Sequence, residues 1–293
     1  MDETCGPNIR RLLEGARAPG TVKAYKTALE AFRKWQAAGP EERKRDELTS
    51  AAIFVAKRSI SVKASSLATF VSALAYERLG RKPEEASKWA VLDEMVRARK
   101  KSDEEWVRQF AKEHEINALL SALSRFSWPQ WRKDRAHVLL ILLFYGLLRI
   151  TEAVSLEGED FTMENGYWMV RIRRSKTDQD GQGSNVFIGR EPTFDEVAAR
   201  CQHRQVHGFL LASTDGRKWS SNAAASEVKR ICAFAGIRPL SPHSFRRGGA
   251  TNALDKGTDV DAVRRRSRWA SVDSMEPYVN VSVVSHGGPS HIS

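Results

Sequence analysis

The stretch AHVLLILLFYGLLRITEAVSL, residues 136–156, sets the fold of the second half of the chain. Residues 136–148 are almost wholly apolar, which predicts a helix at the centre of a core rather than on its surface. The run is too short to cross a bilayer. At its end stands Arg149, and Glu152 follows three residues later, where one helical turn can place its carboxylate against the guanidinium. An ordinary ion pair at a helix junction explains the same two residues equally well.

The hydrophobic period changes after this stretch. Residues 167–173 alternate between apolar and polar, and residues 185–188 are short and rich in β-forming side chains, which together predict a hairpin. Residues 175–184 between them are polar and contain two glycines, so the tip is predicted to be long. The remaining segments predict helices near residues 113–126, 221–235, 245–256 and 260–268. The second half is therefore expected to be mostly helical with one small sheet.

Four helices are predicted in the first hundred residues, because apolar side chains recur there at helical spacing. Thr21 and Thr49 are the expected N-terminal ends of the first two. The fourth starts after Pro83 and ends in the basic residues 97–101, and the polar stretch 102–105 is a candidate linker. We therefore expect a helical first domain over residues 1–105 and a second domain over residues 106–293.

The charge of the chain favours a polyanionic partner. The 293 residues are 41% hydrophobic and 28% charged, as in an ordinary globular protein, and carry a net charge of +11. Both sides of residue 105 are basic, so neither is merely a basic tail. A nucleic acid that touches both halves fits this pattern, although many soluble proteins are as basic without binding one.

The cysteines exclude a disulfide scaffold and a zinc module. Cys5, Cys201 and Cys232 are odd in number and widely spaced, which indicates a reducing environment. The first residues contain no apolar signal core. We find no phosphate-binding glycine loop and no group of carboxylates that would hold two magnesium ions.

Three further short segments carry chemistry. Lys176 lies at the predicted hairpin tip, His243 and Arg246 stand three apart so that a starting helix places them on one face, and Trp269 is followed by Tyr278. Gly248, Gly249 and Ala250 beside the His-x-x-Arg pair would let another element pack closely. Each signal is weak alone, since a loop lysine is usually solvated, a lone histidine is more often structural, and a tyrosine near a C-terminus usually has no special role.

Taken in this order and at these distances, the segments resemble the tyrosine recombinase (phage integrase) family, and its Cre-like branch most. The family pattern is an arginine, a hairpin lysine, His-x-x-Arg, a histidine or tryptophan, and a nucleophilic tyrosine. It falls here on Arg149, Lys176, His243, Arg246, Trp269 and Tyr278. The resemblance implies the DNA breaking-rejoining fold, which is mainly α: a helical core-binding (SAM-like) N-terminal domain and a mostly helical catalytic domain with a small antiparallel β-sheet.

The resemblance also implies a reaction. Arg149 and Arg246 would donate hydrogen bonds to the non-bridging oxygens of a phosphodiester, Glu152 would hold Arg149, and Tyr278 would attack the phosphorus. His243 would accept the tyrosine proton, Trp269 would donate its indole N–H, and Lys176 would protonate the leaving 5′-oxygen. The product, a 3′-phosphotyrosine, keeps the bond energy, so no ATP, metal or other cofactor is expected.

The implied partners are double-stranded DNA with an inverted-repeat target and further copies of the chain. A monomer or dimer would pair into a homo-tetramer on two sites, inside the cell at DNA and without a membrane. Candidate DNA contacts, each explained almost as well by a solvated face, are Lys23, Lys26, Lys57, Arg58, Lys63, Arg174 and Arg247. Two alternatives stay open: a type IB-like topoisomerase with the same chemistry, and a DNA-binding protein without catalysis.

Overall fold

The computed structural model describes residues 15, 17–39, 46–78, 83–102, 110–173, 183–204, 208–213, 215–269 and 275. The chain divides into two compact units, Met1–Val107 and Arg108–Ser293, which we describe separately. That each unit is an independent domain stays a prediction. No described helix combines the length and apolar character needed to cross a membrane.

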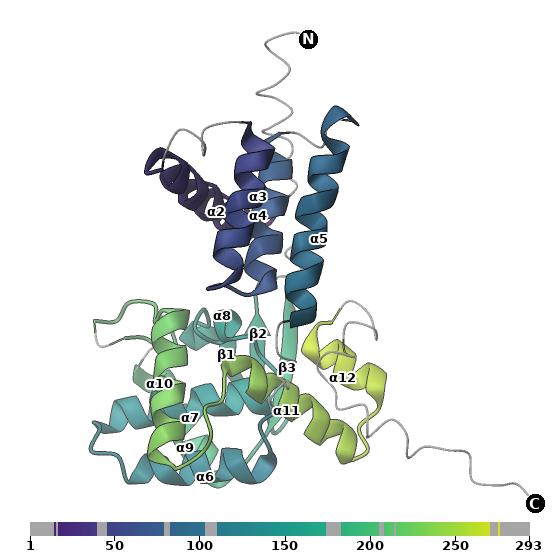
Figure 1. Ribbon diagram of the computed structural model, residues 1–293. Helices are drawn as coiled ribbons and strands as arrows, with labels where there is room; N and C mark the ends of the chain where they lie inside the picture. Colours follow the sequence, from purple (N-terminus) through teal and green to yellow (C-terminus); the bar gives the residue numbers. More distant parts are fainter. Residues whose placement is uncertain are drawn as a thin grey trace, which may run out of the picture. The chain divides into compact units, whose positions relative to one another are not determined.

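Unit 1 is helical where the structure describes it (Figure 1). Its elements are α2 (Pro19–Ala37), α3 (Glu47–Ser59), α4 (Ala64–Glu77), the 3₁₀ turn η2 (Pro83–Glu85) and α5 (Ala86–Ser102). Aromatic side chains fill its core: the ring of Phe32 lies 5.3 Å from that of Phe54 and 5.1 Å from that of Phe70. The four predicted helices are present.

Two predicted helix starts in unit 1 are wrong. The carboxylate of Asp46 accepts a hydrogen bond of 3.0 Å from the backbone N–H of Thr49, so Asp46 caps α3 and Thr49 lies inside the helix. Helix α2 begins at Pro19, whose fixed φ suits a first helical position, and Thr21 lies inside it. Asp46 and Pro19 are both visible in the sequence. Each favours a helix start more strongly than the threonine that follows it.

Unit 2 is built around α7 (Gln130–Phe144), whose residues 134–136 and 138–144 are buried. This confirms the central helix predicted from residues 136–148, but the helix ends at Phe144 and Leu147 has a positive φ of 52°. The other helices are α6 (Glu113–Ser124), the short α8 (Ile150–Ala153), the 3₁₀ turn η3 (Gly158–Asp160), α9 (Pro192–Arg204), α10 (Ser221–Phe234), α11 (Pro242–Asp255) and α12 (Val260–Ser267). Helix α9 was not predicted.

The sheet of unit 2 has three antiparallel strands in the order β1 (Phe161–Glu164), β2 (Tyr167–Ile172) and β3 (Ser184–Gly189). The predicted hairpin is β2 and β3, joined in register with Trp168 opposite Ile188. Strand β1, which pairs with β2, was not predicted. Residues 174–182 at the hairpin tip, with Arg174 and Lys176, lie outside the described residues.

Helix α11 approaches its neighbours closely at two glycines. A Cβ at Gly249 would lie 1.8 Å from the carbonyl oxygen of Phe144, and one at Gly248 would lie 1.8 Å from that of Ala111. The close packing expected at these glycines is therefore present. At Gly249 it sets the middle of α11 against the end of α7, and the chain continues from there to Arg149.

A Gly249→Ala variant is expected to lose about 3 kcal/mol of unfolding free energy, because the added methyl meets backbone atoms that cannot rotate away. Urea unfolding followed by circular dichroism measures this. The matched control is Gly189→Ala, where a Cβ meets nothing within 4 Å and the stability should hardly change. Equal stability of the two variants would contradict the packing described.

Candidate active site

The carboxylate of Glu152 lies at the centre of the candidate site. Glu152 is the third residue of α8, and its carboxylate accepts hydrogen bonds of 2.7 Å from both the backbone N–H and the Nη1 of Arg149, the N-cap residue. The Glu152 side chain is only 3% exposed, whereas that of Arg149 is 18% exposed. The contact expected between these two residues is therefore present. Its catalytic purpose stays a prediction.

Arg246 reaches the same carboxylate from α11. It is almost fully buried, donates from Nη1 to the Leu147 carbonyl at 2.7 Å and from Nη2 to the Ser267 carbonyl, and its Nη1 lies 3.7 Å from Glu152 Oε2. Arg149 and Arg246 are 97 positions apart in the sequence (246 minus 149). The fold brings both to one carboxylate, as their assignment to one site requires.

The residues that follow α12 complete the group. Nη2 of Arg268 lies 2.6 Å from Glu152 Oε2 and 3.2 Å from the Leu147 carbonyl oxygen. The ring of the buried Trp269 lies 5.3 Å from the guanidinium carbon of Arg246, close enough for a cation–π contact. We call Arg149, Glu152, Arg246, Arg268 and Trp269 the Glu152 cluster. No role was assigned to Arg268 from the sequence.

The Glu152 cluster is electrostatically prepared for an anion. Three guanidiniums face one carboxylate, which leaves an excess of two positive charges. Burial alone raises the pKa of Glu152, but Arg268 and then the backbone N–H and guanidinium of Arg149 lower it below its ordinary value. Among the described residues, Nε and Nη2 of Arg149 make no hydrogen bond, so this partly exposed side chain can offer one edge to a phosphate.

His243 lies at the start of α11, one turn before Arg246. Ser241 caps this helix by accepting a hydrogen bond from the Ser244 N–H, and Pro242 occupies the first helical position. The His243 side chain is exposed. Residues three apart on a helix share a face, so its imidazole can approach a group held by Arg246.

Tyr278 lies outside the described residues, as do Lys176 and Arg174. Met275, three positions before Tyr278, is described and buried. It packs in one apolar cluster with Leu147 and Trp269.

The candidate DNA contacts of unit 1 are exposed. Lys23 and Lys26 lie on α2, Lys57 and Arg58 lie in the last turn of α3, and Lys63 precedes α4. Arg99 Nε donates to the Ser59 carbonyl at 2.8 Å, which brings the basic end of α5 beside the end of α3. The exposed side chains at these ends, which we call the basic surface of unit 1, are Lys57, Arg58, Lys100 and Lys101. In unit 2, Arg247 is partly buried on α11.

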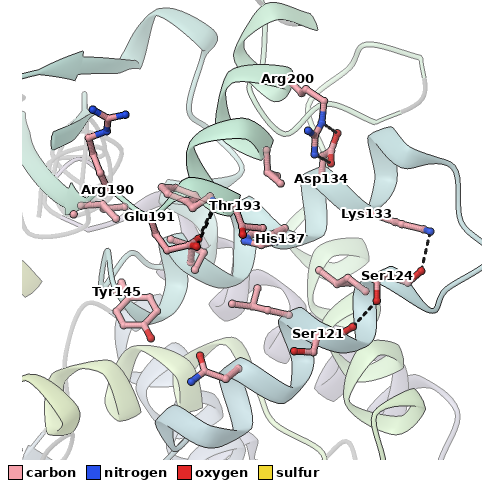
Figure 2. A pocket seen from close by; sticks show the side chains of 18 of the residues that line it. Ser121, Ser124, Lys133, Asp134, His137, Tyr145, Arg190, Glu191, Thr193 and Arg200 are labelled. Carbon is pink, nitrogen blue, oxygen red and sulfur yellow. Dashed lines mark hydrogen bonds and ion pairs between the residues drawn. The ribbon is translucent and has the colours of Figure 1, made fainter. Parts of the chain in front are cut away.

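A separate cavity of about 1000 Å³ lies between α6, α7, α9 and the end of β3 (Figure 2). It contains His137, whose pKa is lowered by burial, and the ion pair of 2.9 Å between Arg200 and Asp134. No residue of the Glu152 cluster lines it. The candidate site is therefore distinct from this cavity.

The described residues contain no group of three or more His, Cys, Asp or Glu side chains arranged to hold a metal ion. Cys201 and Cys232 are free thiols and buried. Burial raises the pKa of Cys201 to about 11 and also raises that of Cys232, so both thiols stay protonated at neutral pH.

Residues 109–283 match the model of the phage integrase family, so the chain belongs to that family. Tyrosine recombinase XerA of Thermococcus kodakarensis is 27% identical over 176 residues, covering 58% of this chain and 57% of that protein. Tyrosine recombinase XerD of Vibrio cholerae is 27% identical over 172 residues, covering 58% and 56%. The chain thus spans little more than half the length of these curated relatives.

The fold is similar to that of solved structures. A lambda integrase dimer bound to a COC′ core site aligns with a TM-score of 0.64 over 98% of this chain and 78% of that one, at 16% identity. At so low an identity this likeness shows the fold alone. It agrees with the mainly helical architecture and the small antiparallel sheet expected from the sequence.

Proposed function

We propose that this chain is a site-specific DNA recombinase, which cuts and rejoins DNA through a covalent 3′-phosphotyrosine at Tyr278 without ATP or metal. The observation that carries the proposal is the convergence of Arg149 and Arg246 on Glu152, with Trp269 against Arg246. These residues come from separate segments of the sequence, and their meeting at a site with excess positive charge is what phosphoryl transfer requires.

In the proposed reaction the two arginines bind the non-bridging oxygens of the scissile phosphate. Arg149 offers its open edge, and Arg246 is held rigidly by two backbone carbonyls, so little reorganisation is needed when charge shifts onto these oxygens. The Tyr278 oxygen forms a bond to phosphorus, its proton passes to His243, and the 5′-oxygen leaves with a proton from Lys176. Attack of a 5′-hydroxyl on the phosphotyrosine reverses these steps and restores Tyr278.

The position of Met275 supports the role of Tyr278. Its side chain is buried with Leu147 and Trp269, and Trp269 belongs to the Glu152 cluster, so a role of the nearby Tyr278 as nucleophile fits this position. The proposed substrate is duplex DNA with inverted repeats, held partly by the basic surface of unit 1. Lambda integrase has been solved as a dimer on a core site, and we propose that this chain also acts as an oligomer, a tetramer when two sites are paired.

The test uses two supercoiled plasmids that carry the DNA flanking the chain's own gene. The purified chain is incubated with them without ATP or divalent metal and quenched with detergent. A covalent protein–DNA complex together with exchanged plasmid segments is the expected result. Relaxed circles without exchange would show that the chain is a topoisomerase and not a recombinase. Binding without any covalent complex would show that the chain binds DNA without catalysis.

A further inference from the structure

The end of α12, with the two residues that follow it, contacts Arg246 and Glu152 of the candidate site. The carbonyl of Ser267 accepts from Arg246, the guanidinium of Arg268 binds Glu152, and the ring of Trp269 lies against Arg246. Three consecutive residues thus contact either Arg246 or the carboxylate that binds both arginines. The middle one, Arg268, has no role in the proposed reaction, yet its side chain is only 7% exposed.

Arg268 adopts a backbone conformation that arginine seldom takes. It is the C-cap residue of α12, with φ of 57° and ψ of 41°, the left-handed region in which glycine is usual. Holding an arginine there costs conformational energy, and glycine would avoid that cost. The side chain must offset it, and two of the contacts that it makes are with Glu152 and the Leu147 carbonyl.

Those contacts link Arg268 to both arginines through shared acceptors. Nη2 of Arg268 donates to Glu152 Oε2 at 2.6 Å, while the other oxygen, Oε1, accepts from Arg149 at 2.7 Å. The same Nη2 lies 3.2 Å from the Leu147 carbonyl oxygen, which also accepts from Arg246 at 2.7 Å. Nη1 donates to the Arg266 carbonyl at 2.8 Å, which fixes the guanidinium to its own turn.

We infer that Arg268 is a positioning residue, which holds the Glu152 carboxylate and the Leu147 carbonyl so that Arg149 and Arg246 are aligned for the scissile phosphate. This inference rests on the proposed function. Because the Arg268 guanidinium is buried and points to Glu152, it acts through the two phosphate-binding arginines rather than on the DNA. Its removal should therefore slow cleavage and leave DNA affinity nearly unchanged.

The test variant is Arg268→Gly, since glycine fits the left-handed backbone and the fold should persist. With the supercoiled plasmid above and saturating protein, the rate of covalent complex formation is expected to fall roughly 10–100-fold, the range known for residues that orient metal ligands. Arg268→Lys keeps the charge and should retain more activity than Arg268→Gly. In a double-mutant cycle, Glu152→Gln combined with Arg268→Gly should lose little beyond Glu152→Gln alone.

Two controls separate positioning from general destabilisation. Asn165→Gly relieves another left-handed residue, of φ 48°, outside the Glu152 cluster. Arg238→Ala removes a guanidinium that lies 3.0 Å from the mostly buried carboxylate of Glu115. Both should keep the parental cleavage rate, although Arg238→Ala should lower the melting temperature.

A second measurement needs no DNA. Among the described residues, the charged groups that face Glu152 are Arg149, Arg246 and Arg268, and Arg268 and Arg149 lower its pKa below the value of about 4.3 in an unfolded chain. The stability that this contributes is complete at neutral pH and is lost as the pH falls through the folded-state pKa. The pH-dependent part of the stability difference between the parent and Arg268→Gly should therefore vanish in acid, whereas relief of backbone strain is independent of pH.

The outcomes distinguish the inference from the proposed function. A parent that forms no covalent complex overturns both. A parent that cleaves while Arg268→Gly cleaves equally fast, or an Arg268→Gly loss that multiplies with that of Glu152→Gln, overturns the inference alone. A stability difference that is the same at every pH also overturns it, because Arg268 would then not hold the carboxylate.

Discussion

A Tyr278→Phe variant is expected to form no covalent complex with DNA, while it binds the same plasmid as tightly as the parent. The substitution removes one oxygen, which is the proposed nucleophile, and leaves the ring in place. Phenylalanine cannot be deprotonated or attack phosphorus, so no conformational adjustment can rescue the reaction. The measurement is a detergent quench followed by electrophoresis of the protein–DNA complex, together with a mobility-shift assay of binding.

The matched control is Tyr167→Phe, since Tyr167 is an exposed tyrosine on β2 outside the Glu152 cluster. It should cleave at the parental rate. If the Tyr278→Phe variant still became attached to DNA, another residue would be the nucleophile and the proposed mechanism would fall. If it lost binding as well as cleavage, Tyr278 would be needed to hold DNA rather than to attack it.

Local patterns were sufficient to predict the central helix and part of the candidate site. The pairing of Arg149 with Glu152 depends only on a spacing of three residues at a helix start, and the buried character of residues 136–148 depends only on their composition. The convergence of Arg246 and Trp269 on that pair is a long-range property. It was expected from the resemblance to a family, since no local rule places residues from distant segments together.

Arg268 shows why other parts of the site could not be predicted. It stands in the run Arg264–Trp269, which contains four arginines and reads as a solvated basic end of a helix. Its partner Glu152 lies 116 positions earlier in the sequence. The guanidinium is buried where it meets Glu152 and the Leu147 carbonyl, and those contacts belong to the tertiary structure.

The unpredicted elements of the fold differ in their causes. Strand β1 has four residues and a burial pattern without clear alternation, so it pairs with β2 because of the hairpin beside it rather than its own sequence. Helix α9 could have been predicted from the sequence. Phe194, Val197, Ala198 and Cys201 recur at helical spacing after Pro192, and all four are buried.

An Arg149→Ala variant is expected to cleave DNA roughly 10³–10⁵ times more slowly than the parent, the range that a single arginine contributes to phosphoryl transfer. The open edge of Arg149 is the part of the Glu152 cluster that is ready to receive an oxygen, and alanine offers no donor in its place. Single-turnover cleavage at saturating protein measures the loss. DNA affinity should change little, because only one of several phosphate contacts is removed.

The Arg149→Ala variant should remain folded. Its slow cleavage would therefore distinguish a catalytic role of Arg149 from a purely structural one. Alanine keeps the backbone N–H that donates to Glu152 at 2.7 Å, and the carboxylate keeps Arg268 at 2.6 Å, so the loss of stability should stay below about 3 kcal/mol. Arg149→Lys should cleave nearly as poorly as Arg149→Ala, since one ammonium cannot bind Glu152 and a phosphate oxygen with the geometry of a guanidinium. Arg217→Ala, at an exposed arginine paired with Asp215, is the control that should change neither quantity. An Arg149→Ala variant that unfolds readily yet cleaves at the parental rate while folded would leave the pair only a structural role, and the phosphate would have to be bound elsewhere.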